Sequence, residues 1–263
     1  MREKRDVVRQ VVVAASAVFA VIGSAVGSGA AGGTPIQDAA GGALSASATP
    51  IAPGTPAFSI WAVIYLGLVA YAVWQLLPAQ SDAPRHRRLG YWIAASLVLN
   101  AAWILSVQAN LLALSLVVIA ALLVVLCRAF MICVQLPPRG TLDAVITDGT
   151  VGLYLGWVSI ATAANATSVF VAGGFTGFGG NPNVWSAAVL GVAGLVGVLV
   201  AFASRGRIAP ALSLSWGLAW VAVARLTGEP LSTSTAVAAI VAATLVLLAT
   251  LIIRIAPRKV SAS

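Results

Sequence analysis

Eight long apolar segments, separated by short connections rich in polar, glycine and proline residues, follow one another along the chain. Each is close to the roughly 20 residues that a helix needs to cross a membrane. The pattern predicts an all-α membrane protein with about eight transmembrane helices. Their expected bounds are 8–30, 56–77, 89–107, 109–134, 145–171, 184–203, 208–225 and 234–256.

The first apolar segment allows two interpretations. The basic stretch Met1–Gln10, the apolar run and the small residues Ala30-Ala31 resemble a secretory signal. The run is long for a signal, however, and Gly23 and Gly27 have the spacing that lets two membrane helices pack closely. We expect a retained first helix, with cleavage as the alternative.

The basic residues lie in alternate connections, which indicates the orientation of the helices. Fourteen of the 15 Lys and Arg residues fall on one side of an eight-helix arrangement, and the positive-inside rule assigns that side to the cytoplasm. Both ends of the chain are then cytoplasmic. Arg225 alone falls on the outer side, four residues from Glu229, and we expect these two to form an interfacial ion pair.

Composition excludes several classes of protein. Hydrophobic residues make up 60% and charged residues 8% of the 263 residues, whereas a soluble domain carries about 25% charged residues. The net charge of +8 does not indicate nucleic-acid binding, because the charges lie between apolar segments. The preference for Arg over Lys, with abundant Ala, Val and Gly, is typical of a GC-rich bacterium and predicts the bacterial cytoplasmic membrane as the location.

The residues needed for most catalytic or cofactor chemistry are missing from the predicted helices. His86 is the only histidine, and we expect it to be solvated in an arginine-rich connection. With no histidine in a predicted helix, bis-histidine haem ligation and Ser–His or Cys–His nucleophilic catalysis are excluded. Because no lysine lies in a predicted helix either, a retinal Schiff base is excluded as well. We predict no enzyme activity, no cofactor and no metal site.

A few polar side chains in or beside the apolar segments need an explanation. Cys127 and Cys133 are interpreted as buried structural thiols, since their spacing suits neither a metal site nor a disulfide. Asp143 and Asp148 flank the start of the fifth helix, where a carboxylate stabilises the helix dipole. A proton-relay role for the two aspartates is the alternative.

Aromatic and amide side chains share faces on three helices. Trp61 and Tyr65 are four residues apart, Asn100 and Trp103 three apart, and Trp157, Ala161 and Asn165 step by four. At 1.5 Å per residue, all of them lie about 7 to 21 Å below the outer membrane edge. This layer has the flat walls and few amides of a ligand pocket. The competing interpretation is an interfacial aromatic belt with amides that tie helices together.

The two longest outer connections differ in what they predict. Residues 31–56 are rich in Gly, Ala, Ser and Thr and could be a flexible linker. Because Pro50, Pro53 and Pro56 restrict the last stretch, a lid above the aromatic layer is the other interpretation. The glycine-rich connection 173–183 is expected to be mobile. Trp216 and Trp220, on one face of the seventh helix, are expected to pack against neighbouring helices.

Three stretches resemble the tryptophan-rich sensory protein family, also called the translocator protein or TspO/MBR family. Residues 53–74, PGTPAFSIWAVIYLGLVAYAVW, are similar to its proline-rich loop and W-x-x-x-Y helix. Residues 97–103, LVLNAAW, and 153–165, LYLGWVSIATAAN, are similar to its L-x-L-N-x-x-W and Y-L-x-W-x-x-x-A-T-x-x-N motifs. The chain departs from the family at Ile104-Leu105, where members often carry Pro-Pro.

The resemblance implies a five-helix bundle over residues 1–171, to which residues 172–263 add three helices. It also implies a pocket for tetrapyrroles such as porphyrin or haem, or for sterol-like apolar molecules. Carried over by position, the ligand-binding residues are Phe58, Trp61, Tyr65, Asn100, Trp103, Trp157, Ala161 and Asn165.

Our first hypothesis is an integral membrane sensor or carrier for such flat apolar ligands. The alternatives are a small secondary transporter, which predicts internal repeats and broken helices near mid-membrane, and a membrane assembly subunit whose additional helices bind a partner protein. The lipid bilayer is an expected partner in each case, and a homodimer remains open.

Overall fold

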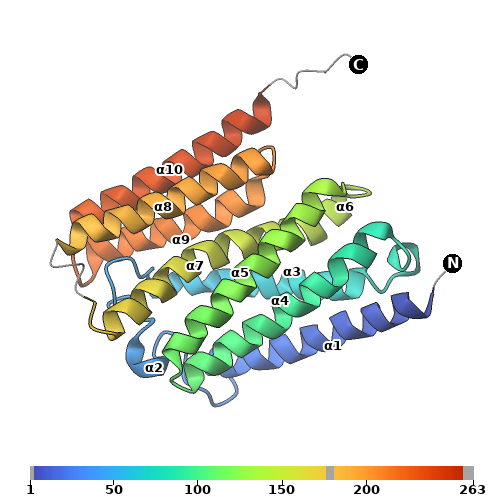
Figure 1. The fold of residues 1–263 in the computed structure, drawn as a ribbon, viewed down its shortest axis with the longest axis horizontal. Coiled ribbons are helices and arrows are strands. Elements are labelled where there is room, and N and C mark those ends of the chain that lie inside the picture. Colours follow the sequence, from blue (N-terminus) through green and yellow to red (C-terminus); the bar gives the residue numbers. More distant parts are fainter. Residues whose placement is uncertain (1–2, 176–180, 257–263) are drawn as a thin grey trace.

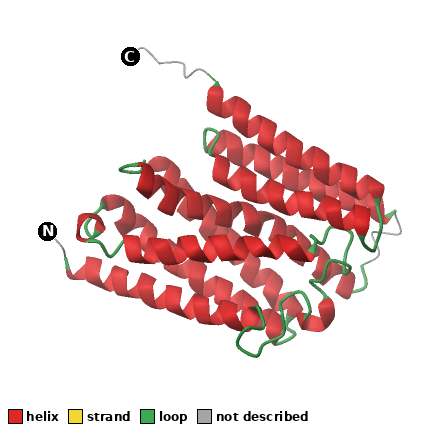
Figure 2. Ribbon diagram, turned by 180° about the vertical axis from the view of Figure 1, so that it is seen from behind, coloured by secondary structure: helices red, strands yellow, loops and turns green. Residues whose placement is uncertain are grey.

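The computed structural model describes residues 3–175 and 181–256. Long helices run side by side along the molecule (Figure 1), and the described part contains helices and connections without a strand (Figure 2). Eight segments are long and apolar enough to cross a membrane, which confirms the all-α membrane fold. They are α1 (Lys4–Gly27), η1 with α3 (Thr55–Ser59, Ile60–Trp74), α4 (Pro84–Gln108), α5 (Leu112–Gln135), α6 to α7 (Thr141–Asp143, Ala144–Gly149, Thr150–Ala172), α8 (Pro182–Ala203), α9 (Ile208–Thr227) and α10 (Thr233–Ile255).

The helices form two groups, which contact each other mainly through one helix of each group. Helices α1, α3, α4, α5 and α7 pack together, and α8, α9 and α10 form a second group beside them (Figure 1). The contact between α7 and α9 joins the groups. The start of α1 and the end of α10 point to the same end of the molecule (Figure 1), as an even number of spans requires.

Small residues let neighbouring helices approach closely. A Cβ atom on Gly23 of α1 would lie 3.1 Å from the Cβ of Ala101 in α4, and one on Gly27 would lie 2.7 Å from a side-chain carbon of Ile104. The predicted packing role of the Gly23–Gly27 pair is therefore confirmed. Helix α1 packs into the first group through this contact.

The outward surface of the helices is apolar. Leu66, Val124 and Ile255 are 71%, 68% and 78% exposed, and similar side chains face outward from every long helix. Such a continuous apolar surface is far larger than soluble monomers tolerate. The protein is accordingly a multi-pass membrane protein in contact with the lipid bilayer.

A buried network of charged residues joins α4, the start of the fifth span and α9. The guanidinium of Arg85 lies 3.0 Å from the Asp143 carboxylate and also pairs with Asp148, which lies 2.6 Å from Arg207. Thr147 donates to Asp143 at 2.8 Å. The two aspartates thus stabilise this end of the bundle, as predicted, but chiefly by pairing with arginines on other helices.

This network explains where the predicted helix bounds were wrong. Helix α4 begins at Pro84 rather than residue 89, and the fifth span begins at Thr141 rather than 145, with a π-helical turn over Ala144–Gly149. Charged residues that the sequence pattern placed in a connection are neutralised by distant partners, so they can lie within the helices. Pro84 at the first helical position suits this start.

Two single-residue predictions need correction. His86 is buried rather than solvated, because the extended helix α4 turns its ring inward to within 5.7 Å of the Tyr71 ring centroid. Cys133 is buried as expected, but Cys127 is exposed, since it faces outward from α5 toward the lipid side. Six residues of separation on a helix place the two thiols on different faces.

The first outer connection packs onto the helices, so it is not a bare linker, and its role as a lid stays a prediction. It contains the short helix α2 (Ala39–Gly42) and the buried residues Ile36, Ile51 and Ala52. Arg225 reaches this connection, and the expected ion pair with Glu229 is wrong. Its guanidinium donates to the backbone carbonyl of Glu229 and to other backbone carbonyls instead. Residues 176–180 of the second outer connection, which we expected to be mobile, lie outside the described residues.

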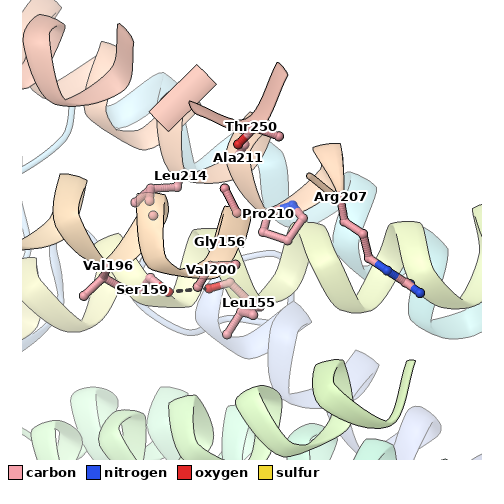
Figure 3. Close-up of a pocket in the computed structure, with 12 residues that line it drawn as sticks. Leu155, Gly156, Ser159, Val196, Val200, Arg207, Pro210, Ala211, Leu214 and Thr250 are labelled. Carbon is pink, nitrogen blue, oxygen red and sulfur yellow. Dashed lines mark hydrogen bonds between the residues drawn. The ribbon is translucent and has the colours of Figure 1, made fainter. Parts of the chain in front are cut away.

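A narrow crevice marks where α7, α8, α9 and α10 meet. Figure 3 shows Gly156 and Ser159 of α7 opposite Pro210 and Leu214 of α9. The crevice has a volume of about 10 Å³, which is no larger than one water molecule needs. It is therefore a close packing junction between the two groups of helices and not a ligand site.

Candidate functional site

The predicted aromatic residues meet in one cluster between η1, α3 and α7. The ring centroid of Trp61 lies 5.7 Å from that of Tyr65 and 6.2 Å from that of Trp157, and the Phe58 and Trp157 rings meet edge to face at 5.7 Å. These are the separations at which aromatic pairs attract. Tyr154, which the sequence analysis missed, joins the cluster at 5.8 Å from Trp61. Its position three residues before Trp157, on the same helical face, was the available signal.

Asn100 lies behind the cluster and links three helices. Tyr65 of α3 donates its hydroxyl to Asn100 Oδ1 at 2.7 Å, and Asn100 Nδ2 donates to the Tyr154 hydroxyl of α7 at 2.9 Å. The Tyr154 hydroxyl in turn donates to the Ser96 carbonyl at 3.3 Å. Asn100 is buried and its amide is occupied, so the structure places it where it orients Tyr65 and Tyr154.

Asn165 links α7 to α4 and α5. Its Oδ1 accepts a hydrogen bond from the indole nitrogen of Trp103 at 2.8 Å, and its Nδ2 donates to the Ser115 hydroxyl at 3.1 Å. Ser115 had no role in the sequence analysis, and a single serine in an apolar segment offers no signal for one. The two asparagines therefore hold the aromatic walls in place, which is the tying function that intramembrane amides often serve.

Two cavities lie on either side of the aromatic cluster. The larger, about 470 Å³, opens between α1, α3 and α4 and is lined by Ser24, Gly27, Ser28, Pro35, Ile36, Gln37, Phe58, Ser59, Trp61, Ala62, Tyr65, Trp103 and Ile104. We call it the open cavity. The smaller, about 30 Å³, is lined by Leu44, Ala52, Pro53, Phe58, Trp61, Trp103, Trp157, Ala161, Ala164, Asn165 and Ser168. We call it the inner cavity.

The cavities account for most of the predicted site residues. Phe58, Trp61 and Trp103 line both cavities, Tyr65 lines the open one, and Trp157, Ala161 and Asn165 line the inner one. Asn100 lines neither. The wall contributed by α1 and by residues 35–37 was missed, because Ser24, Gly27 and their neighbours carry no aromatic or amide pattern.

Trp157 has an unused hydrogen-bond donor. Its side chain is 2% exposed, and its indole nitrogen has no hydrogen-bond partner among the described residues. A buried donor without a partner costs about 1–3 kcal/mol. The wall of the inner cavity thus carries a group that a ligand with an acceptor oxygen would satisfy.

Comparison with known proteins identifies the family. The chain matches the family described as TSPO-like protein over residues 12–252. This chain belongs to the TSPO-like protein family. The matched range includes α8, α9 and most of α10 as well as most of α1 and the next four spans of this TSPO-like protein. No curated protein and no solved structure was found to match it. Membership indicates a membrane sensor or transporter type of function.

The Tyr65–Asn100 hydrogen bond gives a first testable expectation for this TSPO-like protein. Tyr65→Phe leaves Asn100 Oδ1 buried without its donor, which costs about 1–3 kcal/mol. We expect a lower melting temperature in detergent than for Tyr91→Phe. That control removes the hydroxyl of a tyrosine that is 49% exposed on α4, the helix that carries Asn100. Equal melting temperatures for the two variants would show that the bond does not hold the helices together.

Proposed function

We propose that this TSPO-like protein is an integral membrane sensor or carrier that binds tetrapyrroles or similar flat apolar molecules in the open cavity. The observation that carries the proposal is the aromatic wall of that cavity. Its volume of about 470 Å³ falls within the range of small-molecule sites, about 300–1,000 Å³, which are lined mainly by apolar and aromatic groups.

Binding would come from ring stacking and apolar burial. A flat ring system can lie against Phe58, Trp61 and Trp103, while the Tyr65 hydroxyl, Gln37 and the serines of the lining offer polar contacts at its edge. Because three rings separate the open cavity from the inner one, a ligand that displaces them would join the two spaces. It could then accept a hydrogen bond from the Trp157 indole nitrogen.

The composition of the walls favours binding over catalysis. The residues that line the two cavities carry no histidine, cysteine, lysine or carboxylate, so they offer no nucleophile with an adjacent base. Among the described residues, no group of His, Cys, Asp and Glu side chains could hold a metal ion. We therefore propose a binding protein that is not an enzyme, with no bound cofactor of its own.

The transporter alternative has less support from the fold. It predicts helices broken near mid-membrane, whereas the π-helical turn Ala144–Gly149 lies at the start of its span and the other spans are regular over their described length. The distribution of basic residues supports a bacterial cytoplasmic membrane location with both ends inside. A homodimer and a partner protein bound through the C-terminal helices remain proposals that co-purification would test.

The test is quenching of tryptophan fluorescence by protoporphyrin IX in the detergent-purified protein. We expect saturable quenching whose midpoint rises at least tenfold in Trp61→Ala, corresponding to about 1.4 kcal/mol, because Trp61 lines both cavities. The Trp157→Ala, Asn165→Ala double variant should weaken binding by a similar factor.

The midpoint and not the amplitude is compared, since each variant loses an emitting tryptophan. Trp92→Ala is the matched control, because Trp92 lies on α4 at the opposite end from Trp103 and is 36% exposed. Linear quenching, or one midpoint for all variants, would end the tetrapyrrole proposal and leave transport assays in vesicles as the next step.

A further inference from the structure

The lid, defined here as residues 43–57, is hydrogen-bonded to α9, a helix of the second group. The amide nitrogen of Gly54 donates to the Trp220 carbonyl at 3.1 Å, and the indole nitrogen of Trp216 donates to the Ala57 carbonyl at 3.0 Å. Both tryptophans belong to α9, more than 150 positions further along the chain. The position of the lid therefore depends on contacts with α9 as well as on the residues next to it in the sequence.

Arg225 of α9 makes the most extensive of these contacts. Its guanidinium donates to the carbonyls of Ala46 and Thr49 in the lid, at 2.5 and 3.3 Å, and to those of Glu229 and Pro230 beyond α9. The side chain is 1% exposed. The guanidinium of an arginine holds five N–H donors in a fixed planar fork, more than the three of a lysine or the two of an amide, so it suits several carbonyls at once.

The fit of the lid against α9 is also steric. A Cβ atom on Gly54 would lie 3.2 Å from a ring carbon of Trp220, so a larger residue here would crowd the indole. The rings of Trp216 and Trp220, which both contact the lid, pack edge to face at 5.7 Å. Hydrogen bonding and close packing thus both hold Gly54 of the lid against Trp220.

The anchored stretch is the roof of the inner cavity. Leu44, Ala52 and Pro53 of the lid line that cavity, and the chain runs on from Ala57 directly into Phe58, which lines both cavities. The bonds from α9 fall on either side of the roof residues Ala52 and Pro53, at Thr49 and at Gly54. Movement of the lid away from α9 would carry these wall residues with it.

We propose that α9 is the anchor of the lid, and that Arg225, Trp216 and Trp220 are positioning residues through which the C-terminal helices control access to the inner cavity. This assigns a role to the three helices beyond residue 171. The anchoring itself depends only on the contacts above, whereas its effect on ligand exchange rests on the proposed function.

Hydrogen–deuterium exchange of the full-length protein tests the anchor without any ligand. We expect amides of residues 43–57 to exchange at least tenfold faster in Arg225→Gln than in the wild type. Arg254→Gln is the matched control, because Arg254 of α10 also donates to a backbone carbonyl, that of Gly206, but lies away from the lid. Lid exchange at the wild-type rate in a folded Arg225→Gln protein would overturn the proposal.

Trp216→Phe gives a second, milder variant if Arg225→Gln does not fold. It keeps a smaller aromatic ring and removes the donor to Ala57, and we expect exchange of the lid to rise by at least threefold. No acceleration would count against the anchor in the same way.

The effect of the anchor on ligand access is measured as the association and release rates of protoporphyrin IX, by stopped-flow quenching of tryptophan fluorescence. Association and release should both become at least threefold faster in the anchor variant, while the dissociation constant changes by less than threefold. A variant that loses affinity with unchanged association would contradict control of access. Loss of protoporphyrin binding in the wild type would overturn the proposed function and leave the exchange result on the anchor standing.

Discussion

Gly156→Ala is expected to force apart the two groups of helices at the α7–α9 crossing. A Cβ atom at this position would lie 2.2 Å from the Pro210 carbonyl oxygen, 2.9 Å from its carbonyl carbon and 3.0 Å from the Leu214 nitrogen. These are backbone atoms of α9 that cannot rotate away, and Figure 3 shows Gly156 next to Pro210 of α9. The helices must therefore separate.

The direction of the effect is opposite to that of helix propensity. Alanine is favoured over glycine by about 1 kcal/mol in a helix, whereas overpacking a close contact costs about 1–3 kcal/mol or more. We expect the crowding term to win by about 1–2 kcal/mol and the melting temperature in detergent to fall by roughly 2–8 °C. Porphyrin affinity should fall as well, because the neighbouring residue Trp157 lines the inner cavity.

Gly191→Ala provides the matched control for this substitution. Gly191 lies on the exposed side of α8, where an added Cβ atom would meet no other atom within 4 Å. Helix propensity should then act alone and raise the melting temperature slightly. If Gly156→Ala were as stable as Gly191→Ala, the close approach of α7 to α9 would be refuted.

Arg85→Gln is expected to be the most damaging change at the charged end of the bundle. It leaves the Asp143 carboxylate, which is 3% exposed, without its ion-pair partner and leaves Asp148 with Arg207 alone. Removing one partner of a buried ion pair typically costs about 3–5 kcal/mol, because the remaining charge stays out of water. We expect strongly reduced yield of folded protein and a melting temperature lower than in Gly156→Ala.

Two further variants separate this effect from a general loss of positive charge. Arg88→Gln removes a charge from the same helical turn, but Arg88 is exposed, so stability should hardly change. Adding Asp143→Asn and Asp148→Asn to Arg85→Gln removes the uncompensated carboxylates and should restore part of the loss. If Arg88→Gln were equally damaging, the basic residues would act through membrane orientation and not through the buried network.

The number and approximate place of the spans could be predicted from the sequence, because both follow from local properties. The length of an apolar run and the rise per residue of a helix decide whether it can cross a membrane, and eight such segments are present. Helical spacing likewise placed Trp61 with Tyr65 and Trp157 with Asn165 on shared faces, and these residues do line the two cavities.

Which other side chains face the cavities depends on how each helix is rotated about its axis. Spacing alone could not show that Asn100 faces the hydroxyls of Tyr65 and Tyr154 and not a cavity. Nor could it show that α1 supplies one wall, since Ser24 and Gly27 carry no distinctive pattern. Packing against neighbours sets these directions, and packing involves every helix at once.

Charged residues show most clearly what the sequence by itself determined and what only the tertiary structure decided. Apolar length determined the eight spans, but the sequence pattern placed Arg85 and His86 in a solvated connection and paired Arg225 with the nearest carboxylate. In the structure, Arg85 is neutralised by Asp143, 58 residues away, and Arg225 is bound by the carbonyl of Ala46, 179 residues away. A buried charge needs partners within a few ångströms, and only the folded chain brings such distant partners together.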